Sequence, residues 1–260
     1  MISKTEGLVL RGYRMSESSK VVVIYTRNAG KVRVVARGAR RPRSKFGASV
    51  EPITWGAYVY YSRENRDLQT LSEGEILYAF EGLKRVYRRL AYASAVCDLL
   101  DRLTPEEDPN SLLCSITLDS LRWMETVEEA SVELPLWYFQ LKAAAMLGYR
   151  PHLSGCVACG TRITGDVACF DAGRGGTVCR RCDRGGIEVK LATVRYLEHL
   201  QTARADRIDD EGFRGIDTGE ARRVLRGFLW RHIENRGQVK SLDFLNRLLA
   251  AESPPAPYGS

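Results

Sequence analysis

The sequence predicts an α+β protein, with a five-stranded β-barrel at the N-terminus and an α-helical domain that carries a zinc-ribbon-like insert with four cysteines. Three features of its 260 residues predict this fold. Residues 1–80 hold short β-branched and aromatic runs between turn residues, whereas residues 81–252 repeat apolar side chains every three or four positions. Two Cys-x-x-Cys pairs within residues 153–188 mark the insert.

Five strands are expected in residues 1–80. They are expected at Leu8 to Tyr13, Val21 to Thr26, Lys31 to Ala36, Trp55 to Tyr61 and Leu68 to Tyr78. The turn Asn28-Ala29-Gly30 joins two of them as a hairpin. Because no long helix interrupts them, they favour the small barrel of the oligonucleotide-binding (OB) type. Such a barrel uses one face of each strand for its own core, so half of the rings at Trp55, Tyr58, Tyr60 and Tyr61 are expected to be structural.

Helices are expected after Phe80, where the spacing of apolar residues changes to three and four. The expected helices run from about Leu83 to Leu103, Ser111 to Val127, Ser131 to Gly148, Leu191 to Thr202, Ala221 to Gly237 and Leu242 to Leu249. The proline-rich end, residues 253–260, is expected to be a disordered tail.

The positive charge is concentrated in the predicted barrel. Residues 11–45 contain eleven Lys or Arg and one acid, whereas residues 81–152 contain eight basic and eleven acidic residues. Residues from 153 onward are nearly balanced, with seventeen basic and fourteen acidic side chains. A basic barrel on a near-neutral body predicts a polyanionic partner for the barrel. Nucleic acid is favoured, although charge by itself leaves a membrane surface open.

The densest basic segment is the loop after the third expected strand, where five cations occur between residues 37 and 45. Lys and Arg neutralise phosphates and release counterions, which gives affinity for any nucleic-acid sequence. A solvated loop without a ligand is the alternative. The residues predicted to contact DNA are Arg37, Arg40, Arg41, Arg43 and Lys45 of the loop, with Arg11, Arg14, Lys20 and Arg33 from the adjoining strands. Phe46 is a further candidate for stacking on bases.

The two cysteine pairs predict one structural zinc ion. Cys156 and Cys159 are separated from Cys179 and Cys182 by nineteen residues, within the range of zinc ribbons. Four thiolates complete a tetrahedral site and leave no position for a water molecule. A redox dithiol pair or an iron–sulfur ligand set is the alternative. Cys97, Cys114 and Cys169 are expected to be packed thiols.

The sequence predicts no catalytic site. It lacks a Gly-x-x-x-x-Gly-Lys-Ser/Thr loop for nucleotide phosphates, and its acidic clusters fall in expected loops between helices. No apolar run approaches the roughly 18 residues of a membrane span. With no signal-peptide pattern at the N-terminus, a cytoplasmic protein is expected.

Several segments together carry a resemblance to a known family. They are Thr5-Glu6-Gly7-Leu8-Val9-Leu10, the loop from Ala36 to Gly47, Glu51-Pro52, Leu90-Ala91-Tyr92-Ala93-Ser94, Leu103-Thr104-Pro105-Glu106, Leu147-Gly148-Tyr149-Arg150-Pro151 and both cysteine pairs. In this order, over nearly the whole chain, they resemble the RecO family of bacterial recombination mediators.

The resemblance implies an N-terminal OB barrel, an α-helical body and, in the cysteine-bearing branch, a zinc insert. It also implies binding of single- and double-stranded DNA, annealing of complementary strands, and action at the bacterial nucleoid. The implied protein partners are RecR and the acidic, apolar C-terminal tail of the single-stranded-DNA-binding protein. Binding of this tail is implied to help the RecA recombinase load in place of that protein. The alternatives are a zinc-containing OB-fold RNA-binding or ribosome-associated factor, and a nucleic-acid-processing enzyme with an unrecognised metal site.

Overall fold

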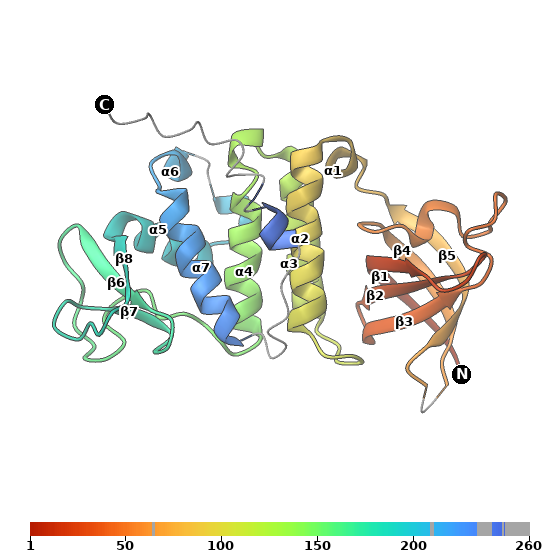
Figure 1. The fold of residues 1–260 in the computed structure, drawn as a ribbon, viewed down its shortest axis with the longest axis horizontal. Coiled ribbons are helices and arrows are strands. Elements are labelled where there is room, and N and C mark those ends of the chain that lie inside the picture. Colours follow the sequence, from red (N-terminus) through yellow and green to blue (C-terminus); the bar gives the residue numbers. More distant parts are fainter. Residues whose placement is uncertain (64–65, 209–210, 233–240, 246, 248–260) are drawn as a thin grey trace. The chain divides into compact units, whose positions relative to one another are not determined.

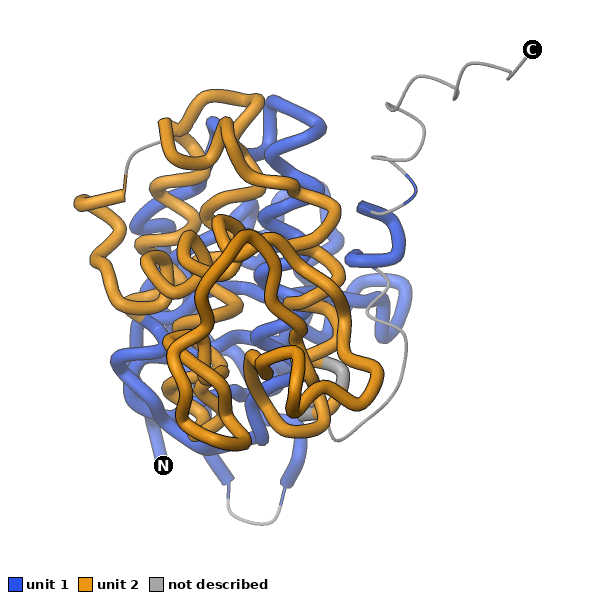
Figure 2. Tube along the Cα trace, turned by 90° about the vertical axis from the view of Figure 1, so that its left-hand side faces the viewer, with its two compact units in different colours: residues 1–114, 237–260 blue, residues 115–236 orange. Residues whose placement is uncertain are grey.

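The computed structural model describes residues 1–63, 66–208, 211–232, 241–245 and 247. The chain forms two compact units, coloured separately in Figure 2. One comprises residues 1–114 with the described residues after 236, and the other comprises the described part of residues 115–236. The predicted tail 253–260 lies outside the described residues, as do the predicted helix ends at Gly237 and Leu249.

A closed five-stranded barrel belongs to the first unit (Figure 1). Its strands are β1 (Ile2–Arg14), β2 (Lys20–Thr26), β3 (Gly30–Ala36), β4 (Trp55–Tyr61) and β5 (Gln69–Tyr78). The order around the barrel is β1-β2-β3-β5-β4, and only the short β3–β5 pairing is parallel. All five predicted strands are confirmed, although β1 begins at Ile2 because its first residues pair with the end of β4.

The barrel interior takes alternate side chains from its strands, as the pleat of a strand requires. Tyr58 and Tyr60 point into this core and are only 1% and 4% exposed. Trp55 is also buried, under the guanidinium of Arg27, whose Cζ lies 5.5 Å from the ring centroid. Tyr61 is the one exposed ring of the four. Three of the four rings are therefore structural, one more than the half that the sequence predicts, and burial removes all three from the candidates for base stacking.

Two helices follow the barrel in the first unit, α1 (Glu81–Arg85) and α2 (Tyr87–Leu103). The sequence predicts one continuous helix over this range, but Val86 has extended backbone angles and interrupts it. β-branched residues such as valine fit extended backbone better than most side chains do. The end of α2 before Pro105 agrees with the prediction. Residues 241–245 are helical, and the Ser241 hydroxyl donates to Asp98 of α2 at 2.8 Å.

The helices predicted from residue 111 onward are present in the described residues, although the third begins at Leu134 rather than near Ser131, where the chain forms a 3₁₀ turn. They are α3 (Ser111–Thr126), the 3₁₀ turn η2 (Glu129–Ser131), α4 (Leu134–Met146), α5 (Leu191–Thr202), η3 (Ala205–Arg207), α6 (Glu211–Arg214) and α7 (Thr218–His232). Pro135 occupies the first turn of α4, and Gly148 follows its end with a φ of +86°.

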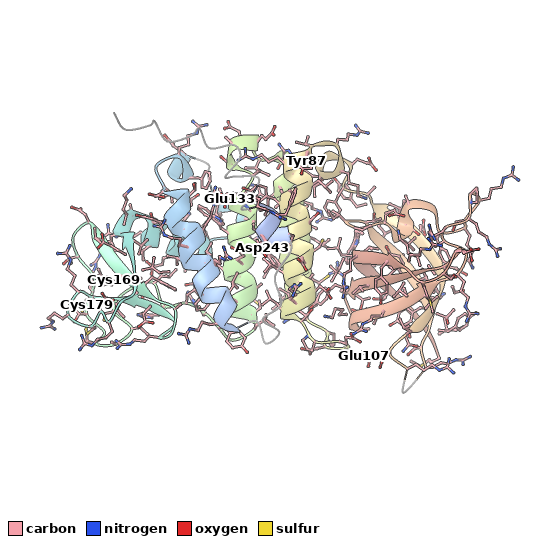
Figure 3. All side chains as sticks on the ribbon, viewed as in Figure 1. Tyr87, Glu107, Glu133, Cys169, Cys179 and Asp243 are labelled. Carbon is pink, nitrogen blue, oxygen red and sulfur yellow. The ribbon has the colours of Figure 1, made fainter. Side chains whose placement is uncertain are left out.

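A three-stranded sheet, in the order β7-β6-β8, lies within the second unit. Its strands are β6 (Val167–Asp171), β7 (Gly176–Val178) and β8 (Ile187–Lys190). Phe170 of β6 and Phe228 of α7 pack edge to face in the core of this unit, with ring centroids 6.2 Å apart. Glu133 at the start of α4 accepts two hydrogen bonds of 2.7 Å from Arg222 of α7 (Glu133 is labelled in Figure 3).

Candidate functional sites: a four-cysteine centre and a basic barrel loop

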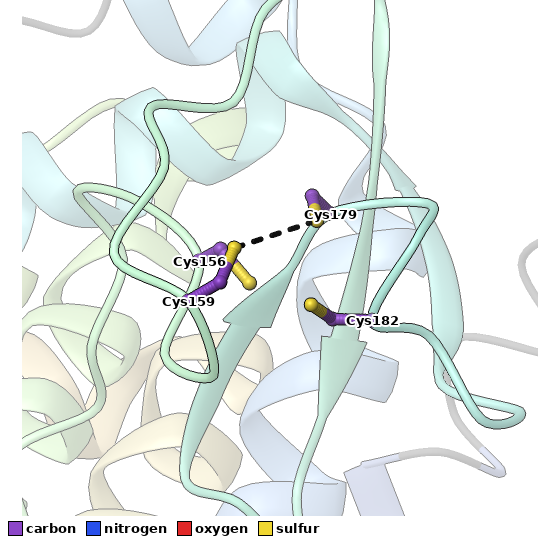
Figure 4. A group of neighbouring side chains, drawn as sticks. All are labelled: Cys156, Cys159, Cys179 and Cys182. Carbon is purple, nitrogen blue, oxygen red and sulfur yellow. Dashed lines mark hydrogen bonds between the residues drawn. The ribbon is translucent and has the colours of Figure 1, made fainter.

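The four predicted metal ligands come together within the second unit (Figure 4). All four sulfur atoms lie within 4.8 Å of one another, and the Sγ atoms of Cys159 and Cys179 are 3.8 Å apart. Four sulfurs placed about 2.3 Å from one ion, in a tetrahedron, stand about 3.8 Å from each other. The cluster of Cys156, Cys159, Cys179 and Cys182 therefore has the dimensions and the donor chemistry of a tetrahedral thiolate site.

The charge state of these thiols also fits a bound cation. Burial raises the pKa of Cys156, but hydrogen bonds from the backbone of Cys179, Cys159 and Ala158 outweigh it and lower that pKa to about 6. Contacts with the sulfur atoms of Cys179 and Cys159 raise the pKa of Cys182 to about 12. Four thiolates at this distance repel one another, so they do not all ionise without a cation. A metal ion supplies that cation and binds the deprotonated form.

Tight turns hold each cysteine pair. In the first turn the N–H of Gly160 donates to the carbonyl of Cys156 at 2.8 Å, and Gly160 has a φ of +71° that favours glycine. In the second turn the N–H groups of Cys182 and Asp183 donate to the carbonyl of Cys179 at 2.9 and 3.0 Å. The hydroxyl of Thr177 on β7 donates to the carbonyl of Gly155 at 2.6 Å, which ties the first turn to the sheet.

The three remaining cysteines are packed thiols, as predicted. Cys97 and Cys114 are buried, and burial raises their pKa values to about 12 and about 11. Cys169 of β6 belongs to the hydrophobic core of the second unit and lies outside the group of four (Cys169 and Cys179 are labelled in Figure 3). Burial raises its pKa first, and the nearby Asp183 raises it further.

The basic loop between β3 and β4 is exposed to solvent. Arg37, Arg41 and Arg43 are exposed, and none of them forms an ion pair with any residue that the structure describes. Arg14 at the end of β1 is also exposed and forms no ion pair with a described residue. Lys45 is also exposed, with its Nζ 5.2 Å from the ring centroid of Phe46. Their contact with DNA stays a prediction, but these five cations are free to meet a polyanion.

Arg40 differs from its neighbours because it holds the loop in place. Its guanidinium donates to the carbonyls of Ser16 and Glu17 at 3.1 and 3.0 Å, and its backbone N–H donates to Ser18 at 3.0 Å. These bonds fix the basic loop against the turn between β1 and β2. Arg40 is thus a positioning residue for the loop, whether or not it also reaches a phosphate.

Phe46 is not available to stack on bases, contrary to the expectation from the sequence. Its side chain is only 3% exposed and lies in the core of the barrel beside Val50 and Tyr58. The loop turns back into the barrel at this point, because Phe46 gains more from burial than an exposed ring would. The same turn places Ser49, whose backbone carbonyl accepts the hydroxyl of Tyr58 at 2.7 Å.

Two of the predicted DNA contacts on the strands are instead paired with carboxylates of the same chain. Arg11 Nε lies 2.7 Å from Asp101 at the end of α2, and Arg33 forms an ion pair with Glu106 in the following loop. Lys31 of β3, which is buried, also pairs with Asp101 at 3.1 Å. In OB folds the face of the second and third strands usually receives the nucleic acid. Here carboxylates of the same chain already form ion pairs with cations of that face.

Lys20 is the third predicted contact that pairs with a carboxylate of the chain, since its Nζ lies 2.8 Å from Glu51. The remaining opening beside the basic loop is a groove of about 870 Å³ over the outer face of β1, β4 and β5. Its lining holds three cations, Lys4, Arg27 and Lys45, and three carboxylates, Glu6, Glu73 and Glu75, so its net charge does not favour a polyanion. Arg27 pairs with Glu6 at 3.4 Å. Lys4 and Arg27 are not among the predicted contacts. The alternation along β1, which turns Lys4 outward, is the signal that points to the first of them.

None of the helices, over the residues that the structure describes, is long and apolar enough to cross a membrane.

Comparison with known proteins agrees with this architecture. Residues 1–80 match the family model described as Recombination protein O N terminal, and residues 85–243 match Recombination protein O C terminal. The chain is 40% identical over 157 residues to the DNA repair protein RecO of Symbiobacterium thermophilum and 34% identical over 159 residues to that of Bacillus subtilis. These two alignments cover 60% and 61% of this chain, and they span 60% and 61% of the relatives' own lengths.

A longer alignment joins both parts of the chain to one relative. The chain is 32% identical over 246 residues to the DNA repair protein RecO of Pelotomaculum thermopropionicum, which covers 94% of this chain and 93% of that protein. The matches therefore extend over the barrel, the helices and the four-cysteine insert together. The chain belongs to the RecO family of DNA repair and recombination proteins.

Proposed function

We propose that the protein is a DNA-binding recombination mediator that anneals complementary strands. With RecR, it helps to load the RecA recombinase onto DNA coated with the single-stranded-DNA-binding protein. The observation that carries the proposal is the set of exposed, unpaired cations on the barrel, Arg14, Arg37, Arg41, Arg43 and Lys45. Phosphate contacts of this kind bind single and double strands of any sequence. Membership of a family whose relatives are named DNA repair proteins supports DNA over RNA as the ligand.

We further propose that the four cysteines hold one zinc ion and that the ion is structural. The sulfur spacing fits a tetrahedral site, and four thiolates leave no coordination position for a reacting water. The proposal therefore includes no catalytic residue. Action on chromosomal DNA would place the protein in the cytoplasm, at the nucleoid.

The second unit offers a place for the tail of the single-stranded-DNA-binding protein, which is acidic and ends in apolar residues. A groove of about 570 Å³ is lined by Trp123 and Tyr138, whose rings pack edge to face at 5.8 Å, and by Arg122 and Arg204. The half-buried ring of Trp123 can receive apolar side chains, with Tyr138, which is only 5% exposed, packed against it. The guanidinium of Arg122 can receive a carboxylate, whereas Arg204 already pairs with Asp206. Asp119 and Asp206 also line the groove, so the net charge alone does not draw the tail.

A strand-annealing assay tests the proposal. Complementary DNA strands coated with the cognate single-stranded-DNA-binding protein should pair faster when the protein is added, and adding RecR and RecA should give RecA filaments on the coated DNA. Preference for structured RNA over these substrates would support the RNA-binding alternative instead. Strand cleavage with magnesium or manganese would support the enzyme.

A further inference from the structure

We propose that the zinc insert carries a second nucleic-acid surface, formed by Arg180, Arg181 and Arg184 of its second cysteine turn. This surface contacts the phosphate backbone of one strand while the basic loop of the barrel holds another. The inference rests on the proposed function, because it supplies the second strand-binding surface that annealing needs. Both surfaces lie on the same chain but in different units.

The three arginines are exposed and closely spaced. Arg180 and Arg181 stand between the ligands Cys179 and Cys182, and neither forms an ion pair or a hydrogen bond with any described residue. Arg184 is exposed as well, and its Nη1 donates to the backbone carbonyl of Asp183 at 3.0 Å. Three guanidinium groups within five residues form a local positive patch on a unit that is otherwise nearly balanced in charge.

Two carboxylates of the insert, Asp171 and Asp183, already accept backbone hydrogen bonds. Asp183 accepts the backbone N–H of Gly186 at 2.9 Å. Asp171 accepts the N–H groups of Gly173 and Arg174 at 2.8 and 3.1 Å. The side chain of Arg174 also pairs with Asp171. Backbone donors thus offset these two charges, and the guanidinium groups of the turn are left for an external anion.

The backbone that bears the arginines is fixed before any ligand arrives. The carbonyl of Cys179 accepts the N–H groups of Cys182 and Asp183, and the carbonyl of Cys182 accepts the Arg174 guanidinium at 3.1 Å. A turn held in this way loses little backbone entropy when it binds. The four-cysteine centre therefore both folds the insert and presents its cations.

The chemistry of the turn selects a polyanion rather than an apolar peptide. Residues 179–186 read Cys-Arg-Arg-Cys-Asp-Arg-Gly-Gly, so the turn itself contributes no large apolar side chain beside its guanidinium groups. Arginine pairs with phosphate through two parallel hydrogen bonds and stays charged at every physiological pH. The rival explanation is that the arginines only neutralise the thiolates of the metal centre. It predicts that reversing their charge lowers the zinc content.

The test uses the full-length protein and two oligothymidine strands, which cannot pair with each other. The first strand is fixed sparsely on beads and loaded with protein, and capture of a labelled second strand is then measured. The variant is Arg180→Glu with Arg181→Glu. The matched control is Arg195→Glu with Arg207→Glu, which reverses two exposed arginines of the same unit away from the cysteine turn. Zinc content and thermal unfolding are measured for all three proteins.

The wild-type protein and the control should capture the second strand. The Arg180→Glu, Arg181→Glu variant should keep its zinc and bind the first strand within about twofold of wild type, because the barrel loop is unchanged. Its second-strand capture should fall about 25-fold at 0.1 M salt, as expected for two lost phosphate contacts.

Equal capture by the variant and the wild type would overturn the inference. It would indicate that two barrels of a protein dimer bridge the strands, because the variant keeps its barrel loop. Loss of zinc in the variant would favour the neutralisation explanation and also count against the inference. A wild-type protein that binds no DNA at all would instead overturn the proposed function, so the two failures are distinct.

Discussion

Reversing the charge of Arg41 and Arg43 to glutamate tests the basic loop with an effect whose size follows from counterion release. Both side chains are exposed, whereas Arg40, which fixes the loop to the β1–β2 turn, stays in place. Each phosphate contact on a single strand contributes about −0.7 to the slope of log affinity against log salt, so losing two contacts flattens the slope by about 1.4. If the plots of log affinity against log salt for the variant and the wild type meet near 1 M salt, the variant's affinity is lower by about 25-fold at 0.1 M and about 5-fold at 0.3 M.

The assay is fluorescence anisotropy of a labelled oligothymidine at four or more salt concentrations, with the Arg195→Glu, Arg207→Glu protein as the control of equal charge change. Thermal unfolding should match wild type, since the reversed side chains lie outside the core. The loss should be the same for strands of any sequence, because phosphate contacts carry no base information. An unchanged slope in the variant would refute the reasoning and leave the loop as merely solvated.

Three further predictions concern the second unit. Cys159→Ser should lose the metal and lower the unfolding temperature, because metal binding is coupled to folding, whereas Cys169→Ser should keep its zinc by elemental analysis. Zinc retained by the Cys159→Ser protein would contradict the ligand assignment. Glu133→Gln should lower the free energy of unfolding by about 2 kcal/mol in urea titrations, since it weakens two charge-assisted hydrogen bonds from Arg222. A change below about 0.5 kcal/mol would show that solvent replaces these bonds. Trp123→Ala should weaken binding of a peptide that carries the tail sequence of the single-stranded-DNA-binding protein by about tenfold or more in calorimetry. Equal affinity of the variant and the wild type for this peptide would place the tail elsewhere.

Most of the barrel could be predicted because its signals are local. The alternation along β2 and β3 and the Asn28-Ala29-Gly30 turn lie within one stretch of sequence, and the structure joins these strands as expected. The four cysteines were equally accessible to sequence reasoning, because two turns of fixed spacing leave little choice of partner. In both cases short-range geometry determines the result.

The electrostatic partners could not be predicted, because they depend on tertiary neighbours. Arg33 and Glu106 are 73 residues apart in the sequence, and no pattern in either segment links them. The prediction for Phe46 is wrong for a related reason. A ring next to a basic loop suggests a ligand contact, but here the chain turns back so that the ring fills the barrel. Charge density identified the loop, and only the fold separated its free cations from the paired ones.

The covered face of the barrel limits where the chain can be cut. Val21, Val23 and Tyr25 alternate with core residues along β2 and so face outward, yet each is at most 2% exposed. Tyr25 lies beside Asp108, Asn110 and Cys114. A fragment ending at Phe80 would bare these apolar side chains and leave Lys31 without its carboxylate. Such a fragment should aggregate, whereas one ending after residue 114 would keep the covering segment. The barrel and the segment up to residue 114 that covers it must therefore be inherited together. An exchange of domains between relatives would have to include both.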